Sequence, residues 1–303
     1  MKKMNGIIKR DIRNPIIKPE DVPGGCRGIY NSAIIKSEDK LFKGVFRVDG
    51  KDGIPRLHKG ESKDGIKFKV DAESIKFKNQ REGHAVGDAY DPKITEIEGI
   101  YYITFANDGV IGIAKTIDFK NFEFLCNASV PRNRNCVLFP EKINGFYVRL
   151  ERPFFDPHKD QADIWFSKSP DLVFWGDFHL VMRPKGWAGF KIGPGAPPIK
   201  TKEGWLEIYH GVHKSCSGLV YSMGLVLLNL ERPWEVLHRA EKYLLGPEME
   251  YERIGLVPNV VFPTAAILEE ASQKVSIYYG AADTYVCVAY AQLNDLVDFC
   301  IRE

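Results

Sequence analysis

The sequence has 303 residues, of which 44% are hydrophobic and 27% are charged, and its net charge is +2 at pH 7. This composition is typical of a folded protein with a large core and argues against a disordered chain. Because the charges nearly balance and no dense Lys/Arg tract occurs, we expect neither a nucleic-acid nor a membrane partner.

The cysteines and the N-terminal residues indicate where the protein works. Six cysteines are scattered along the chain without a CxxC pair, which argues against a disulfide framework and a zinc site. No HExxH motif is present, so we expect no metal. The first ten residues lack the apolar core of a signal peptide, and no run is long enough to span a membrane. We therefore expect a cytoplasmic protein.

Short extended runs separated by polar turns recur along the chain, and sustained helical periodicity is scarce. Glu98-Gly99 and Asn144-Gly145 lie between such runs and predict hairpin turns, since glycine accepts positive φ. The pattern occurs five times, at residues 29–70, 88–125, 135–180, 195–240 and 259–295. Five small antiparallel sheets predict an all-β fold, a five-bladed β-propeller formed by residues 1–303 as a single domain. An irregular two-sheet sandwich is the alternative.

Asp91 is the first candidate for chemistry. It precedes Pro92 at the start of a strand-like segment, and proline favours extended backbone at the residue before it. Asp91 is therefore held where a loop becomes a strand, a suitable place for a catalytic acid; an ordinary solvated turn aspartate is the alternative. In a propeller the first strand of each blade lines the central channel. Six polar residues at such strand starts are expected to converge: Asn31, Asp91, Arg134, Asn135, Lys191 and Asp283.

Several cationic side chains lie in apolar strand contexts: Arg47, Arg134, Arg152, Lys191 and His210. Buried cations are costly unless they are paired or bound to an anion. Gathered around one channel, they would suit a small dianion such as phosphate. For each residue alone, a surface position or a structural salt bridge is the alternative.

Aromatic and acidic side chains could bind a sugar. Tyr90 and Tyr209 are candidates to stack on sugar faces, although most aromatic residues here must be strand core. Asp49 and Asp283 offer carboxylates for sugar hydroxyls. The chain contains no P-loop and no G-x-S-x-G nucleophile motif.

Several motifs resemble glycoside hydrolase family 130, the β-mannoside phosphorylases. They run through the chain in order: Tyr90-Asp91-Pro92-Lys93, residues 133–145, Arg152-Pro153, Lys191-Ile192-Gly193-Pro194-Gly195, residues 205–212 and residues 278–284. The resemblance implies a five-bladed propeller that transfers a β-linked mannosyl residue to inorganic phosphate with inversion, giving α-mannose 1-phosphate. Phosphate would be a co-substrate, with no cofactor needed.

The resemblance also implies roles for individual residues. Asp91 would be the general acid, its proton reaching the glycosidic oxygen through the 3-hydroxyl of the mannosyl unit. The phosphate-binding positions would be Arg134, Asn135, Arg152, Lys191 and His210. The substrate-binding positions would be Asn31, Arg47, Asp49, Tyr90, Tyr209 and Asp283.

The number of strong carboxylate candidates bears on the reaction. An inverting hydrolase needs one carboxylate as acid and a second to activate water, whereas phosphate is already a nucleophile. One strong candidate among several cations favours phosphorolysis. A β-mannosidase on the same scaffold and a non-catalytic carbohydrate-binding propeller are the alternatives. The linkage, the acceptor sugar and the oligomeric state, a homo-oligomer included, stay open; the first two would depend on loops such as 156–161 and 185–190.

Overall fold

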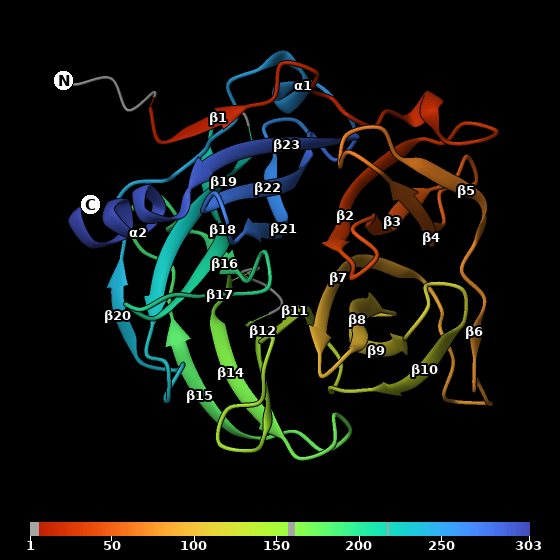
Figure 1. The fold of residues 1–303 in the computed structure, drawn as a ribbon, viewed down its shortest axis with the longest axis horizontal. Helices are drawn as coiled ribbons and strands as arrows, with labels where there is room; N and C mark the ends of the chain where they lie inside the picture. The colour runs from red at the N-terminus through yellow and green to blue at the C-terminus, as the bar shows by residue number, and fades with distance from the viewer. Residues whose placement is uncertain (1–5, 157–160, 217) are drawn as a thin grey trace.

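Five sheets, antiparallel apart from the short pairing of β6 (Phe77–Lys78) with β10 (Phe122–Asn127), stand in a ring around a common centre (Figure 1). This computed structural model describes residues 6–156, 161–216 and 218–303. The sheets, here called blades 1 to 5, occupy residues 28–74, 89–127, 133–182, 191–239 and 261–292, close to the units expected from the sequence. The predicted five-bladed propeller is confirmed.

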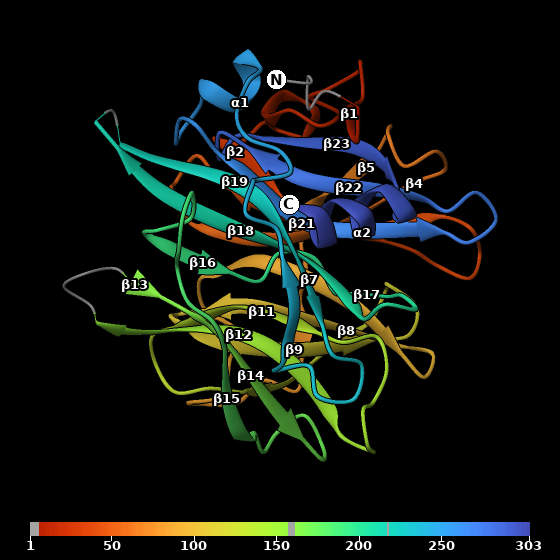
Figure 2. The same ribbon diagram turned by 90° about the vertical axis from the view of Figure 1, so that its left-hand side faces the viewer.

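Each blade is a meander whose first strand lies near the centre of the ring (Figures 1 and 2). Blade 1 contains β2 (Gly28–Lys36), β3 (Phe42–Asp49), β4 (Pro55–Ser62) and β5 (Lys69–Ser74). Blade 2 contains β7 (Ala89–Ile97), β8 (Ile100–Asn107), β9 (Val110–Thr116) and β10 (Phe122–Asn127), with β6 (Phe77–Lys78) beside β10. Blade 3 contains β11 (Asn133–Leu138), β12 (Tyr147–Asp156), β14 (Ile164–Ser169) and β15 (Gly176–Met182), with β13 (Gln161–Ala162) paired to β12.

The last two blades differ slightly from this plan. In blade 4 the inner strand is split into β16 (Lys191–Gly193) and β17 (Ile199–Lys200), followed by β18 (Trp205–Ser215), β19 (Gly218–Leu228) and β20 (Val236–Arg239). Blade 5 contains β21 (Val261–Glu269), β22 (Lys274–Ala281) and β23 (Tyr285–Gln292). In the part of the chain that the structure describes, three short helices complete the fold: the 3-10 turn η1 (Pro19–Asp21), α1 (Glu250–Arg253) and α2 (Leu293–Arg302).

The outermost strand of blade 5 comes from the other end of the chain. Strand β1 (Ile8–Arg10) pairs antiparallel with β23, so that Ile8 lies opposite Ala291. The Arg10 guanidinium also forms two hydrogen bonds with the buried Glu252 carboxylate, at 2.7 and 2.9 Å. The sequence pattern predicted neither β1 nor α2. Together these contacts close the ring.

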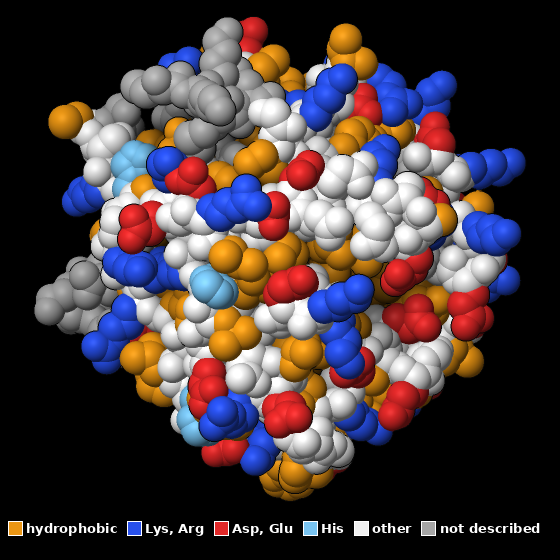
Figure 3. Space-filling view, turned by 60° about the vertical axis from the view of Figure 1, so that its left-hand side comes forward, with side chains coloured by type: hydrophobic (Ala, Val, Ile, Leu, Met, Phe, Trp, Pro, Cys, Tyr) orange, Lys and Arg blue, Asp and Glu red, His pale blue; other side chains and the backbone are white. Residues whose placement is uncertain are grey.

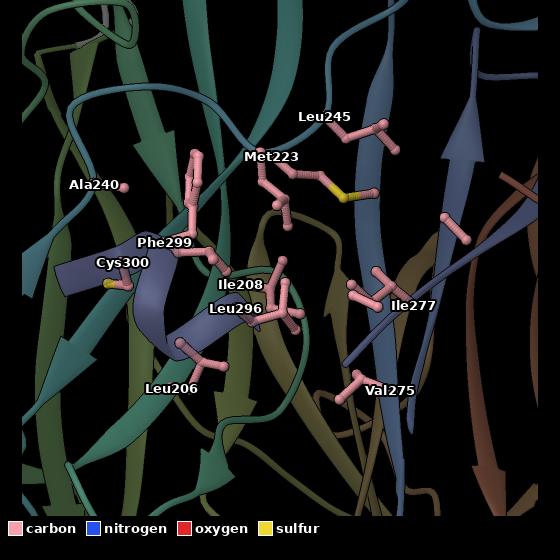
Figure 4. Close-up of a cluster of buried hydrophobic side chains, with 14 of the residues drawn as sticks. Leu206, Ile208, Met223, Ala240, Leu245, Val275, Ile277, Leu296, Phe299 and Cys300 are labelled. Atoms are coloured by element: carbon pink, nitrogen blue, oxygen red, sulfur yellow. The ribbon is translucent and has the colours of Figure 1, made fainter. Parts of the chain in front are cut away.

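Apolar side chains fill the spaces between neighbouring blades. The largest cluster joins blades 4 and 5 beneath α2, where Leu296 and Phe299 pack among side chains from β18, β19 and β22 (Figure 4). Each fully buried side chain of this kind contributes about 1.5–3 kcal/mol. The hairpin turns predicted at Glu98-Gly99 and Asn144-Gly145 are confirmed, since all four residues have positive φ.

Four inner strands carry a β-bulge where they approach the centre of the ring. The register shifts lie at Tyr30/Ala33 in β2, Tyr90/Lys93 in β7, Arg134/Val137 in β11 and Pro263/Ala265 in β21. In the first three the bulge holds a residue with positive φ: Asn31 (46°), Asp91 (51°) and Asn135 (56°). Asn and Asp tolerate this conformation better than other residues with a Cβ atom. Because a bulge redirects the side chain, the same irregularity in three blades can aim three polar groups at one place.

The surface is of mixed charge. On the face shown in Figure 3, basic and acidic side chains are interspersed, and no broad area of one sign is visible. Among the described residues, no helix combines the length and the apolar character that crossing a membrane requires.

Candidate active site

A cavity of about 340 Å³ lies where the inner strands converge. Eight of the twelve predicted site residues line it: Asn31, Arg47, Tyr90, Asp91, Arg134, Asn135, Arg152 and Asp283. A larger hollow of about 540 Å³ lies against β5 and contains none of the predicted residues. Of these two, the smaller cavity combines the carboxylates with the arginines, and it is therefore the candidate active site.

Asp91 lies in the wall of this cavity with a side chain only 11% exposed. Its Oδ1 atom accepts hydrogen bonds from Asn31 Nδ2 at 3.0 Å and from an Arg47 guanidinium N–H at 2.9 Å. Burial alone would raise the pKa of Asp91, but the Arg47 charge and these hydrogen bonds outweigh it and lower the pKa below its ordinary value. Asp91 is thus held as a carboxylate in the resting site.

Arg47 is fixed from several directions. Its guanidinium forms two hydrogen bonds with Asp49, at 2.9 and 3.2 Å, besides the one with Asp91. The guanidinium carbon lies 4.2 Å from the ring centroid of Tyr30 and 5.1 Å from that of Tyr90, within cation–π range. Tyr30 donates its hydroxyl hydrogen bond to Asp49 at 2.7 Å. Asp49 therefore contributes to the site through Arg47 and does not line the cavity itself.

Asp283 faces the same cavity from blade 5, just beyond β22, with φ of +46°. Burial and the neighbouring Asp91 and Asp49 charges raise the pKa of Asp283 to about 7, although Arg47 acts in the opposite direction. At neutral pH this carboxyl is partly protonated, whereas Asp91 is ionised.

Two arginines of blade 3 line the same cavity. Arg134 on β11 and Arg152 on β12 lie directly opposite each other in the antiparallel register. Both guanidinium carbons lie near the ring of Phe154, at 4.8 and 4.9 Å from its centroid. Asn135 adds a side-chain oxygen that is buried without a partner among the described residues. Since like charges directly opposite on two strands repel, this arrangement favours an anion between them.

His210 and Lys191 stand behind this wall, because both are buried and neither lines the cavity. An Arg152 N–H donates to His210 Nε2 at 2.8 Å. The His210 proton must therefore reside on Nδ1, and the ring is neutral. Burial and the charges of Arg152, Lys93 and Lys191 hold the pKa of His210 well below 6.5. A Cβ atom on Gly193 would come within 2.5 Å of the His210 ring, so glycine is required there. His210 therefore holds Arg152 in position as a neutral hydrogen-bond acceptor and adds no positive charge to the site.

The expectation for Tyr209 is corrected by the structure. Its side chain is fully buried, packs on Trp187 with ring centroids 5.9 Å apart, and accepts a hydrogen bond from Arg239 at 3.2 Å. Tyr209 belongs to the core between blades 3 and 4. Successive side chains of a strand point to opposite faces, and on β18 it is the next residue, His210, that points toward Arg152 in the cavity wall.

Five cavity residues were not predicted: Pro55, Asp88, Tyr221, Val260 and Phe262. Val260 and Phe262 belong to the first strand of the fifth predicted unit, and their i, i+2 spacing at the start of that strand was the signal that could have placed them. The Phe262 ring lies 4.4 Å from that of His210, centroid to centroid, so it separates the site from the core.

Lys93 and Glu207 form a second polar feature, buried beneath the cavity. Lys93 Nζ donates to the Pro263 carbonyl at 3.2 Å and lies 5.0 Å from the Phe262 ring centroid. Glu207 accepts a hydrogen bond from the Gly195 N–H at 2.9 Å, while its Oε2 atom is buried without a partner among the described residues. Burial raises the pKa of Glu207 to about 8 and lowers that of Lys93 to about 8.

The Glu207 carboxyl makes stability depend on pH. Between pH 4.5 and about 8 the folded chain keeps a proton that the unfolded chain releases, so the free energy of unfolding falls as the pH rises. We expect the Tm to fall between pH 6.5 and 8, and Glu207→Gln to make that fall smaller. Thermal melts followed by circular dichroism in matched buffers measure this, with the exposed Glu203→Gln as control. An equally steep fall in Glu207→Gln would show that Glu207 is not held neutral.

Comparison with known proteins places the chain in a family. The family model described as beta-1,4-mannooligosaccharide phosphorylase matches residues 2–302. The chain belongs to glycoside hydrolase family 130. Within this family, a beta-1,4-mannooligosaccharide phosphorylase of Ruminococcus albus is 43% identical, and the alignment covers 97% of this chain and 90% of that protein.

Other members of family 130 act on a different linkage. A 1,2-beta-oligomannan phosphorylase of Thermoanaerobacter sp. is 34% identical, with 95% of this chain and 98% of that protein covered. The solved structure of a beta-1,2-mannobiose phosphorylase from Listeria innocua, in complex with beta-1,2-mannobiose, superimposes with a TM-score of 0.85. It is 27% identical and covers 97% of this chain and 99% of that one.

Proposed function

We propose that this chain catalyses the phosphorolysis of β-mannosides, transferring a terminal mannosyl residue to inorganic phosphate. The observation that carries the proposal is that one cavity combines a carboxylate with an arginine pair. Asp91 and the cross-strand pair Arg134 and Arg152 all line it. The curated relatives named above are phosphorylases of β-linked mannosides, which supports the same assignment.

In the proposed reaction, Arg134 and Arg152 bind the phosphate, with Asn135 beside them and Lys191 and His210 behind. A phosphate oxygen attacks C1 of the mannosyl unit from the side opposite the leaving sugar, which gives inversion and α-mannose 1-phosphate. The C1–O electron pair stays with the leaving oxygen, which takes a proton delivered by Asp91. General acid catalysis of this kind contributes about 10²–10⁴-fold.

The linkage that we propose is β-1,4. The matching family model carries that description, and the Ruminococcus albus relative at 43% identity has the same name, whereas the 34% identical Thermoanaerobacter relative acts on β-1,2 linkages. Synthesis from mannose 1-phosphate with mannose, glucose and N-acetylglucosamine as acceptors tests this proposal, because the linkage of each product can be read by NMR. The loop at 156–161 lies largely outside the described residues, so its contribution to acceptor choice is left to that experiment.

The dependence on phosphate separates phosphorolysis from hydrolysis. With β-1,4-mannobiose and no phosphate, we expect sugar release at the limit of detection, whereas millimolar phosphate should produce mannose 1-phosphate in equal amount to free mannose. The physical reason is that a guanidinium pair cannot act as a general base for water. Ion chromatography of the products measures both species. Equal rates with and without phosphate would instead indicate a β-mannosidase, and binding without turnover would indicate a non-catalytic propeller.

We also propose that phosphate is the sole co-substrate and that no metal takes part. A group of three or more His, Cys, Asp or Glu side chains able to hold a metal does not occur among the described residues. Activity that survives dialysis against EDTA would support this. A cytoplasmic location fits the proposed product, because a charged sugar phosphate does not cross the membrane and is therefore retained in the cell.

A further inference from the structure

The resting geometry raises the question of where the catalytic proton is stored. Asp91 Oδ1 already accepts two hydrogen bonds, one of them from the Arg47 cation. Donors placed in this way stabilise a carboxylate and disfavour a carboxylic acid. A general acid must nevertheless hold a proton before it can give one to the leaving sugar. A second carboxyl that lines the same cavity is one group that can supply it.

Of Asp49, Asp91 and Asp283, it is Asp283 that has the fewest hydrogen bonds and ion pairs that would stabilise a negative charge. Asp91 and Asp283 line the same cavity as Arg47, and Asp49 bonds to Arg47 from outside the cavity lining. The hydrogen bonds of the Arg47 guanidinium go to Asp49 and Asp91. Within the described residues, the Asp283 carboxyl forms neither a hydrogen bond nor an ion pair. An uncompensated carboxyl that faces two carboxylates keeps its proton, because a third negative charge at this place would be repelled.

We propose that Asp283 carries the proton in the resting enzyme and passes it across the cavity to Asp91 when a β-mannoside is bound. This inference rests on the proposed phosphorolysis. The other charged or titratable groups whose electrostatic influence reaches the pair are Arg47 and Asp49, with Lys93 acting on Asp91 and the Tyr30 hydroxyl bonded to Asp49. The raised pKa of Asp283, about 7, agrees with this arrangement.

The proton and the electrons balance over one cycle. Asp283 gives its proton to Asp91, and Asp91 gives one to the glycosidic oxygen as the C1–O bond breaks. The attacking phosphate, bound as its monoprotonated dianion, forms the new C1–O bond and loses its own proton. That proton returns to Asp283, so that the pair again holds a single proton between two carboxyls.

The experiment compares two substrates with Asp283→Asn. Asparagine can still bond to sugar hydroxyls but cannot hold a transferable proton. We expect kcat for β-1,4-mannobiose to fall by about 30-fold, part of the contribution that a general acid makes. For 2,4-dinitrophenyl β-mannoside, whose leaving group needs no proton, the fall should be less than about threefold on the same reasoning. An equal loss on both substrates would mean that Asp283 only binds the sugar, and full activity on mannobiose would also overturn the proposal.

Asp49→Asn is the matched control. Asp49 faces the same Arg47 but is fully hydrogen-bonded and lies outside the cavity lining. Its loss should disturb Arg47 and lower both activities by the same factor.

The pH dependence gives a second readout. With saturating phosphate, wild-type activity on mannobiose should fall as the pH rises through about 7, because Asp283 then loses its proton. Asp283→Asn should lack this alkaline limb, and a limb that persists unchanged in the variant would contradict the proposal. Wild-type turnover that does not require phosphate would refute the proposed function instead, so the two failures are distinguishable.

Discussion

Asp91→Asn should lower kcat for phosphorolysis of β-1,4-mannobiose by about 10³-fold, the middle of the range for a lost general acid. Asparagine keeps an oxygen that can accept from Asn31 and Arg47, so we expect the fold to persist, with a Tm within about 3 °C of wild type. The remaining activity should be much higher on 2,4-dinitrophenyl β-mannoside, because that leaving group departs without a proton. Steady-state rates on both substrates, together with a thermal melt, measure the effect.

Asp88→Asn is the control for this experiment. Asp88 also lines the cavity, but it is exposed and lies outside the hydrogen-bond network of Arg47. The same chemical change there should leave kcat within about threefold, since no proton transfer depends on it. If Asp88→Asn lost as much activity as Asp91→Asn, or if Asp91→Asn remained active on mannobiose, Asp91 would not be the acid.

Arg134→Ala should raise the KM for phosphate by about 100-fold while changing the KM for mannobiose by less than about threefold. A charge-assisted hydrogen bond contributes about 1.5–3 kcal/mol, and each 1.4 kcal/mol is a factor of ten. Arg134 is half-buried and lines the cavity beside Arg152. Lys191→Ala should act in the same direction from behind the wall. Initial rates over a grid of phosphate and mannobiose concentrations separate the two constants.

Arg253→Ala, which removes an exposed arginine on α1 outside the cavity, provides the comparison. It loses the same net charge and should change neither constant. A rise confined to the mannobiose KM in Arg134→Ala would place Arg134 in the sugar site and remove it from the phosphate site.

Much of this architecture was predictable because its signals are local. Alternating apolar runs with Asn-Gly and Glu-Gly turns define hairpins without reference to distant residues. The first strands of the blades meet at the centre by the geometry of a propeller. Asn31, Asp91 and Asn135 reach the cavity in this way, and each is a residue type that accepts the positive φ of a bulge.

The remaining features depend on information that is not local. Tyr209 and His210 are neighbours on β18, and the side that each faces is set by pairing with β16 and β19, so a shift of one residue exchanges them. Lys93 of blade 2 and Glu207 of blade 4 influence each other's pKa, although they are far apart in the sequence. Strand β1 has only three residues, which is too short for its sequence pattern to predict that it pairs with β23.

The closure of blade 5 by β1 has a consequence for synthesis of the protein. The ribosome makes β1 before every other described strand and β23 after them, so blade 5 stays incomplete until β23 has been made, while blades 1 to 4 can form as they emerge. Asp283 belongs to blade 5 and is made late, whereas Asn31 and Arg47 belong to blade 1 and are made early. We therefore expect a nascent chain to assemble this cavity only after blade 5 has been made.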